Sequence, residues 1–250
     1  MDGTGTVECI PVILDRKPTD LKFYEGGYSV VPFGNDRYAC YAFSFTGGAT
    51  LKWFRDNFAE EEHRIAVAKG GNVYADLDRR VSDKPTGILV LPHFAGAATP
   101  YMDNGARAVM AGLTLSHTGA DIYRALMEGV TYEMRVNMEH LAAFGIAPRV
   151  LYAVGGGAAS PLWLSIKADV LERPITPLTA PEVGACGTAM LCAVSLGLYP
   201  DLPAAKAAFV QTGETYLPDP ENRAIYQKNF AAYQKLYAAC RPILAEVTDE

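Results

Sequence analysis

Short apolar blocks separated by turn residues fill the first 45 residues of the chain. Three of these blocks, residues 7–14, 28–33 and 38–45, have the composition of extended strands. Gly34-Asn35-Asp36 separates the last two blocks, and a Gly-Asn pair is a strong turn signal. The pattern therefore predicts three strands arranged as an antiparallel meander.

The spacing of apolar residues then becomes helical. Residues 49–58 place three large apolar side chains on one side of a predicted helix. Residues 60–85 are polar and charged, which predicts a partly helical excursion on the surface. The apolar runs 88–91 and 108–113 predict two further strands, the first of them buried. The clearest helix extends from Thr118 to Gly145, because a threonine cap is followed three residues later by an aspartate and a glycine stands at the expected end.

The second half of the chain alternates between strands and helices. Strands are predicted over 150–154 and 174–177, and helices are predicted from Ser160 onward and over 182–196, 204–211 and 221–240. No convincing linker interrupts this order. Residues 1–250 are therefore interpreted as one α/β domain with a mixed sheet.

Composition narrows the class of protein. The 250 residues are half hydrophobic and one-fifth charged, with a formal net charge of -6, which is typical of a globular protein that binds no nucleic acid. No apolar run reaches the roughly 18 residues of a membrane span, and the start lacks the features of a signal peptide. The five cysteines are scattered and form no CxxC pair, which predicts reduced thiols in a cytoplasmic protein rather than disulfides or a zinc site.

Three glycine-rich junctions are the candidates for chemistry. Gly3-Thr4-Gly5-Thr6 precedes a strand, Thr46-Gly47-Gly48 joins a strand to a helix, and Gly155-Gly156-Gly157 leads from a strand to the helix at Ser160. Glycines let backbone amides approach an anion closely, and helix N-termini favour phosphate. Each junction alone also fits a plain turn, but three in one domain favour a nucleotide site assembled at one edge of the sheet.

Other motifs are missing or weak. Neither GxGxxG nor GxxxxGK[ST] occurs, which argues against a dinucleotide-binding fold and a P-loop. The four histidines share no metal-ligand spacing, so no metal site is predicted. Asp103 fits a turn, and Asp169 fits a surface or packing role better than catalysis.

Five stretches occur in an order that is specific in combination: Asp2-Gly3-Thr4-Gly5-Thr6; Thr46-Gly47-Gly48-Ala49 with Trp53; Leu91-Pro92-His93-Phe94-Ala95-Gly96 through Thr99-Pro100; Gly112-Leu113-Thr114 with Ile122-Tyr123-Arg124-Ala125 and Glu128-Gly129; and Val154-Gly155-Gly156-Gly157 through Trp163, Ala168-Asp169 and Glu182-Val183-Gly184-Ala185. Together they resemble the C-terminal domain of the FGGY carbohydrate kinases, a group that includes xylulokinases, glycerol kinases and gluconate kinases. The resemblance extends over nearly the whole chain.

The resemblance implies an actin-like, ribonuclease-H-like fold: a mixed five-stranded sheet with helices on both sides. It implies that ATP lies in a cleft between this domain and an N-terminal domain of the same protein. Gly3 to Thr6 would form a phosphate hairpin in which Thr4 contacts the terminal phosphates. Gly48 would lie near the nucleotide, with Lys52 in the place of a glutamine that helps to bind nucleotide in glycerol kinases. Within Gly155-Gly156-Gly157, the last two glycines would approach the α-phosphate and adenosine.

The resemblance also places the chemistry outside this chain. The general base of the family is an aspartate in the N-terminal domain, upstream of the phosphate hairpin, so no catalytic residue is assigned here and Asp2 is not taken as the base. Most of the sugar or polyol site and much of the Mg²⁺ environment would also lie in that partner domain. We therefore expect the chain to be inactive alone, to form homodimers through the surface left exposed, and to be frayed over residues 1–6.

Two other functions stay open at this stage. The second hypothesis is a non-catalytic actin-like module that binds nucleotide or supports assembly. A third interpretation is an α/β transferase with a different nucleotide cofactor, which the missing GxGxxG motif disfavours.

Overall fold

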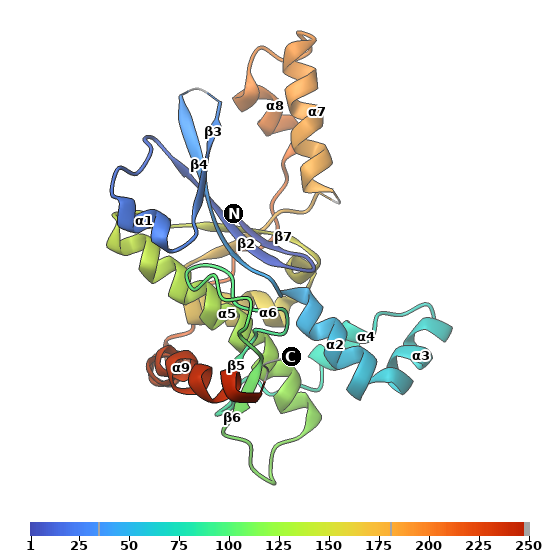
Figure 1. Cartoon of the computed structure of the whole chain (residues 1–250). Helices are drawn as coiled ribbons and strands as arrows, with labels where there is room; N and C mark the ends of the chain where they lie inside the picture. Colours follow the sequence, from blue (N-terminus) through green and yellow to red (C-terminus); the bar gives the residue numbers. More distant parts are fainter. Residues whose placement is uncertain (35, 181, 248–250) are drawn as a thin grey trace.

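A mixed sheet lies at the centre of the molecule. The computed structural model describes residues 1–34, 36–180 and 182–247. The main sheet has the strand order β3-β4-β2-β1-β7-β8 (Figure 1). Strand β1 is antiparallel to β2 and parallel to β7, which in turn is parallel to β8. The strand bounds are β1 Asp2–Thr4, β2 Glu8–Leu14, β3 Ser29–Phe33, β4 Arg37–Ser44, β7 Leu151–Gly155 and β8 Ile175–Pro177.

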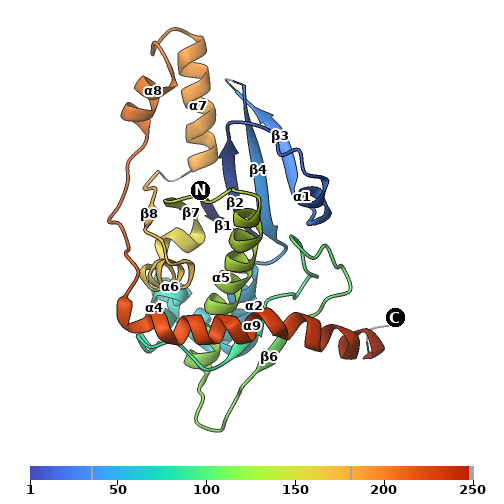
Figure 2. The same cartoon turned by 90° about the vertical axis from the view of Figure 1, so that its left-hand side faces the viewer.

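One face of this sheet packs on helices. The longest of them in this layer, α5 (Gly119–Ala143), lies next to α6 (Pro161–Leu171) and the short α1 (Leu21–Glu25) (Figures 1 and 2). Alternate residues of the strands turn inward to this layer, so Ile10, Cys40 and Leu151 share a core cluster with Met134 of α5. At the start of α5, Thr118 and Asp121 form the predicted capping box.

A second core cluster lies at the far end of α5. There α2 (Gly48–Phe58) and α9 (Pro220–Val247) meet α5 and α6 around large buried aromatic side chains, including Tyr132 and Trp163. The strands β5 (Leu89–Leu91) and β6 (Val109–Ala111) form a separate two-stranded ribbon beside this cluster. The polar segment contains α3 (Glu60–Ala68) and α4 (Val73–Asp78). An arm formed by α7 (Val183–Ser195) and α8 (Leu202–Phe209) projects beyond the sheet in both views.

The predicted α/β order with a mixed sheet is confirmed, with three differences in the strands. Residues 2–4 form the strand β1 instead of a frayed turn, because they pair on both sides, with β2 and β7. The main sheet therefore has six strands instead of five. The first strands form no meander, since β4 lies between β2 and β3 and pairs with both. The segment with α1 carries the chain past the position that β4 later fills.

Two helices also differ from the prediction. Helix α1 was not expected; Asp20 caps it and its Phe23 side chain is fully buried. Helix α9 continues past residue 240 to Val247, with Pro242 inside it. Part of the turn predicted at Gly34-Asn35-Asp36, Asn35, lies outside the described residues.

Candidate functional site

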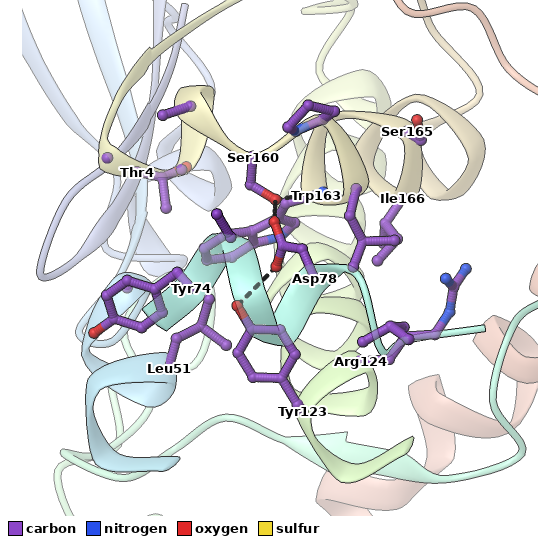
Figure 3. A pocket seen from close by; sticks show the side chains of 18 of the residues that line it. Thr4, Leu51, Tyr74, Asp78, Tyr123, Arg124, Ser160, Trp163, Ser165 and Ile166 are labelled. Carbon is purple, nitrogen blue, oxygen red and sulfur yellow. Dashed lines mark hydrogen bonds between the residues drawn. The ribbon is translucent and has the colours of Figure 1, made fainter. Parts of the chain in front are cut away.

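A cavity of about 930 Å³ lies where the glycine-rich junctions meet (Figure 3). The turn after β1, residues 4–6, forms one wall, and the first turn of α2 lies beside it. Helix α4 and Tyr123 of α5 close another side, and the start of α6 lies opposite. The three glycine-rich junctions, which are far apart in the sequence, therefore reach one cavity.

Close backbone packing builds the end of this cavity that the hairpin Gly3–Thr6 forms. The Gly48 N–H donates to Gly5 O at 2.8 Å, and the Gly47 N–H donates to Thr6 O at 2.9 Å. A Cβ on Gly48 would lie 2.5 Å from Gly5 O, and a Cβ on Gly157 would lie 2.6 Å from the Cβ of Thr4. Side chains at these two glycines would separate the hairpin from α2 and from the start of α6.

The strand β7 leads into this end through a left-handed residue. Gly155 has a φ of 81°, and a Cβ there would lie 2.4 Å from Thr4 O. A 3-10 turn, η1 (Gly156–Ala159), follows and delivers the chain to Ser160, whose side chain accepts from the Trp163 N–H at 3.0 Å and caps α6. The N-termini of α2 and α6 therefore both reach the cavity, and such helix ends favour anions.

Helix α4 contributes the Asp78 carboxylate to the wall of the cavity. Asp78 accepts one hydrogen bond from the Ser160 hydroxyl at 2.7 Å and another from the Tyr123 hydroxyl at 2.9 Å (Figure 3). Burial and the neighbouring Asp78 carboxylate raise the pKa of the Tyr123 phenol, so it remains a hydrogen-bond donor. Asp78 thereby fixes α4 to both α5 and α6 across the cavity.

A buried charge cluster lies directly under the hairpin. The Lys167 ammonium of α6 donates to Asp2, to Thr4 Oγ1 at 2.5 Å and to Glu8 Oε1 at 2.6 Å. Burial raises the pKa of Glu8 well above its usual value. Burial alone would also raise the pKa of Asp2, but the Lys167 charge and hydrogen bonds outweigh it and lower that pKa. The same two carboxyl groups raise the pKa of Lys167 against the effect of its burial.

The sequence of this chain matches a known family of domains. Residues 3–196 match the FGGY family of carbohydrate kinases, C-terminal domain. The chain belongs to this family. The resemblance to the C-terminal domain of the FGGY carbohydrate kinases, which the sequence motifs indicate, is thereby confirmed.

Relatives of the FGGY domain are kinases of several small molecules. The xylulose kinase of Staphylococcus epidermidis is 28% identical over 214 residues, which cover 85% of this chain and 41% of that protein. The glycerol kinase of Psychromonas ingrahamii is 31% identical over 222 residues, covering 88% of this chain and 41% of that protein. This chain therefore spans about two-fifths of the length of these relatives.

A solved structure agrees with the fold. The crystal structure of xylulose kinase from Rhodospirillum rubrum superposes with a TM-score of 0.80 and 29% identity, covering 98% of this chain and 47% of that one. The FGGY domain thus has the predicted actin-like fold of these kinases, and this fold contains the predicted mixed sheet.

The sequence-predicted site residues of the FGGY domain fall into two groups. Seven of them line the cavity: Thr4, Gly5, Thr6, Gly48, Lys52, Gly156 and Gly157. The other two, Gly3 and Gly155, lie in the strands β1 and β7, and they are not among its lining residues. Gly155 acts on the site indirectly, because its left-handed backbone starts the turn to α6.

Lys52 lines the cavity and forms an exposed ion pair. Its ammonium lies 2.7 Å from Asp56 one turn further along α2, and its side chain is 65% exposed. Asp169, expected in a surface or packing role, accepts from the Asp219 N–H at 2.7 Å and from Asn222 at 2.9 Å. It thereby holds the start of α9 against α6. Asp103 pairs with Arg241 of α9, so it links a loop to a helix in addition to turning the chain.

The described residues contain neither a cluster suited to a metal ion nor a helix suited to a membrane span. Residues 1–34, 36–180 and 182–247 contain no group of three or more His, Cys, Asp or Glu side chains that could hold a metal ion. In the same ranges, no helix is both long and apolar enough to cross a membrane. The five cysteines are free thiols.

Sequence reasoning missed three residues of the site. Asp78 lies in the charged segment that is predicted to be a partly helical excursion on the surface, and no site residue is predicted there. Asn72, six residues before it, is the cap of α4 and the local signal for this ordered element. Lys167 stands in the otherwise apolar run of α6, which is the signal that could have revealed a buried partner. Its partner Glu8 begins β2 directly after the hairpin. Glu8 pairs with Thr4 of β1, so the two residues face the same side of the sheet.

Proposed function

We propose that this FGGY domain is the nucleotide-binding half of a kinase that transfers the γ-phosphate of MgATP to a hydroxyl of a sugar or polyol. The observation that carries the proposal is the meeting of the hairpin 4–6 with the N-termini of α2 and α6 in one cavity of about 930 Å³. Helix N-termini and glycine-rich turns favour phosphate, and this arrangement brings both together without a P-loop.

The hairpin end suits the phosphates. Thr6 and Gly5 line the cavity, and Thr6 is exposed, so its hydroxyl is free to turn toward an anion. The Thr4 hydroxyl donates to Glu8 at 2.9 Å. We therefore assign hydrogen-bond donation to the terminal phosphates to Thr6 and to the backbone, and we assign Thr4 the task of shaping the hairpin. Gly48 holds the N-terminus of α2 against the hairpin, because its N–H donates to Gly5 O.

The α6 end suits the α-phosphate and the nucleoside. Gly156 has open space on the cavity side, since the nearest atom to an added Cβ is Thr4 O at 4.0 Å. Gly157 lies against Thr4, and the lining continues through Leu162 and Tyr74. An apolar wall with a few polar groups is typical of a nucleoside site. Lys52 lies at the rim, where its ion pair with Asp56 can open toward a phosphate.

Mg²⁺ and the acid–base chemistry would come from outside the described residues. Bound Mg²⁺ neutralises charge on the β- and γ-phosphates during transfer. This chain offers the exposed Thr6 hydroxyl and two helix ends to those phosphates, and we propose that the metal is held through the phosphates and through an N-terminal domain. That domain would also supply the general-base aspartate and most contacts to the acceptor. The chain alone should accordingly bind ATP without phosphorylating a sugar.

Two measurements on the 250-residue chain test this proposal. Calorimetric titration with ATP should give saturable binding, and a coupled assay of ADP formation should show no turnover with a panel of ketoses and polyols. Absence of ATP binding, or robust turnover by the chain alone, would contradict the proposal. The same sugar panel on the full-length product of the gene distinguishes a kinase from the alternative, a non-catalytic actin-like module, which would bind ATP and phosphorylate none of the acceptors.

A further inference from the structure

Three charged side chains meet in complete burial beneath the phosphate hairpin. Asp2 and Glu8 are 0% exposed and the Lys167 side chain is 2% exposed, although they come from β1, β2 and α6. Burying charges is costly unless each one is paired and hydrogen-bonded. A cluster of this kind in the wall of the cavity therefore points to a specific task.

The hydrogen bonds of the cluster hold Thr4 in one orientation. The Lys167 ammonium has three N–H donors, and it has three acceptors: Asp2, Thr4 Oγ1 and Glu8 Oε1. Thr4 in turn donates its only hydroxyl hydrogen to Glu8. Its Cβ meets the surface of Gly157, which has no side chain to displace it. Thr4 is thus fixed from both sides.

The cluster is neutral only if it contains one proton besides those of the ammonium. Asp2 Oδ1 and Glu8 Oε2 are buried and have no hydrogen-bond partner among the described residues. Two carboxyl groups share the one Lys167 ammonium, which favours a proton on one of them. Because burial favours the neutral form of Glu8, the proton resides there, and the Asp2 anion balances the Lys167 cation.

We propose that Lys167 is a positioning residue for the phosphate groups of the nucleotide. It fixes Thr4, and it cancels the Asp2 charge directly under the hairpin that a triphosphate must approach. Without this cation, a buried anion would remain beside the phosphate end of the cavity, and Coulomb repulsion in a poorly screened site is strong. The adenosine end, at the start of α6, would be affected much less. This inference rests on the proposed nucleotide function.

The test compares charge variants on two ligands. Lys167→Met removes the cation and leaves Asp2 unpaired, whereas Asp2→Asn combined with Lys167→Met removes both charges. Calorimetry measures the affinities for ATP and for adenosine, with Lys228→Met on the exposed side of α9 as the control for loss of one positive charge.

We expect Lys167→Met to weaken ATP binding by about tenfold or more and adenosine binding by less than about twofold, because the penalty concerns the phosphates. The double variant should regain ATP affinity to within about threefold of wild type, because it leaves no buried charge unpaired. Lys228→Met should match wild type for both ligands.

Other outcomes overturn the inference. Equal losses for ATP and adenosine would mean that Lys167 only maintains the fold, and a double variant that binds ATP as poorly as Lys167→Met would exclude charge compensation. Thermal denaturation shows which variants fold. If Lys167→Met alone does not fold, the double variant still decides, since its failure to bind ATP while binding adenosine normally contradicts the proposal. Failure of wild type to bind either ligand would instead refute the proposed function.

Discussion

The carboxylate of Asp78 accepts a hydrogen bond from the hydroxyl of Ser160 at 2.7 Å, although 82 residues separate them in the chain. The same hydroxyl oxygen accepts from the Trp163 N–H and so caps α6. One side chain therefore both starts the helix that faces the cavity and connects it to α4. This contact sets the position of the start of α6 relative to α4.

Replacing this hydroxyl should cost stability. Ser160→Ala removes the cap and leaves Asp78 with one partner fewer, so we expect the free energy of unfolding to fall by about 1–2 kcal/mol in urea denaturation. Ser165→Ala is the matched control, since Ser165 is exposed on the same helix, and it should change stability by less than about 0.5 kcal/mol. Equal effects of the two substitutions would show that the cap and its link to α4 contribute nothing.

Gly157 should tolerate no side chain. A Cβ there would lie 2.6 Å from the Cβ of Thr4 and 2.9 Å from its hydroxyl, so Gly157→Ala must displace the hairpin. We expect a loss of roughly 1–3 kcal/mol of stability, as for other overpacked sites. ATP binding, measured by calorimetry, should weaken by about tenfold or more, because we propose that the hairpin holds the phosphates and this substitution displaces it.

Gly187 provides the control for the change from glycine to alanine. It lies in the interior of α7, and an added Cβ would have no atom within 4 Å. Gly187→Ala should therefore leave stability unchanged or raise it by up to about 1 kcal/mol, and it should leave ATP affinity unaltered. An ATP affinity of Gly157→Ala equal to that of Gly187→Ala would contradict the close packing between α6 and the hairpin.

Removing each of the two hydroxyls of the hairpin should affect a different property: stability for Thr4 and ATP affinity for Thr6. Thr4→Val removes a buried hydroxyl that both Lys167 and Glu8 need, so stability should fall by about 1–3 kcal/mol. Thr6→Ala removes an exposed hydroxyl at the cavity, so stability should stay within about 0.5 kcal/mol while ATP affinity falls by roughly tenfold. Denaturation and calorimetry on both variants separate the roles, and the reverse pattern would show that they are exchanged.

Glu8 predicts a specific dependence of stability on pH. Its pKa is raised in the folded protein, so above its ordinary value of 4.5 the unfolded chain loses the proton while the folded protein keeps it. Stability from this group is then complete below pH 4.5 and declines as pH rises toward the folded pKa. Asp2 does not interfere in this window, because its pKa is lowered below 3.8 in the folded protein.

Glu8→Gln is the variant that exposes this effect. Glutamine retains the shape and a hydrogen-bond donor but cannot ionise, so its stability relative to wild type should increase as pH rises from 4.5 toward neutrality. Denaturation curves at several pH values measure the difference. A constant difference across that range would show that Glu8 is ionised in the folded protein and that the cluster carries a net negative charge.

Local patterns were sufficient for most of the helices and strands. The capping box at Thr118 and Asp121 and the apolar run before Leu91 depend on residues close in sequence, and the structure has the expected elements at both. The strand at Asp2–Thr4 was missed because its pairing partners, β2 and β7, are needed to recognise three residues as a strand. The order of β2, β3 and β4 likewise depends on the path of the connection, which periodicity does not encode.

The glycine-rich parts of the site could be predicted from the sequence. The parts that depend on pairing between residues far apart in the chain could not. Gly48 and Gly157 stand at junctions that the sequence shows directly. Lys167 and Asp2 are 165 residues apart, so nothing in the local sequence of either indicates that they pair in the core. The contacts of Asp78 could not be predicted for the same reason, since its partners Tyr123 and Ser160 lie far from it in the sequence.

We propose that an adenine nucleotide binds with its phosphates against the hairpin. The most direct measurement is a crystal structure of the chain with a non-hydrolysable ATP analogue. We expect the triphosphate to lie beside Gly5, Thr6 and Gly48, with the nucleoside along the start of α6. A nucleotide bound elsewhere, or an empty cavity in crystals grown at saturating analogue, would contradict it.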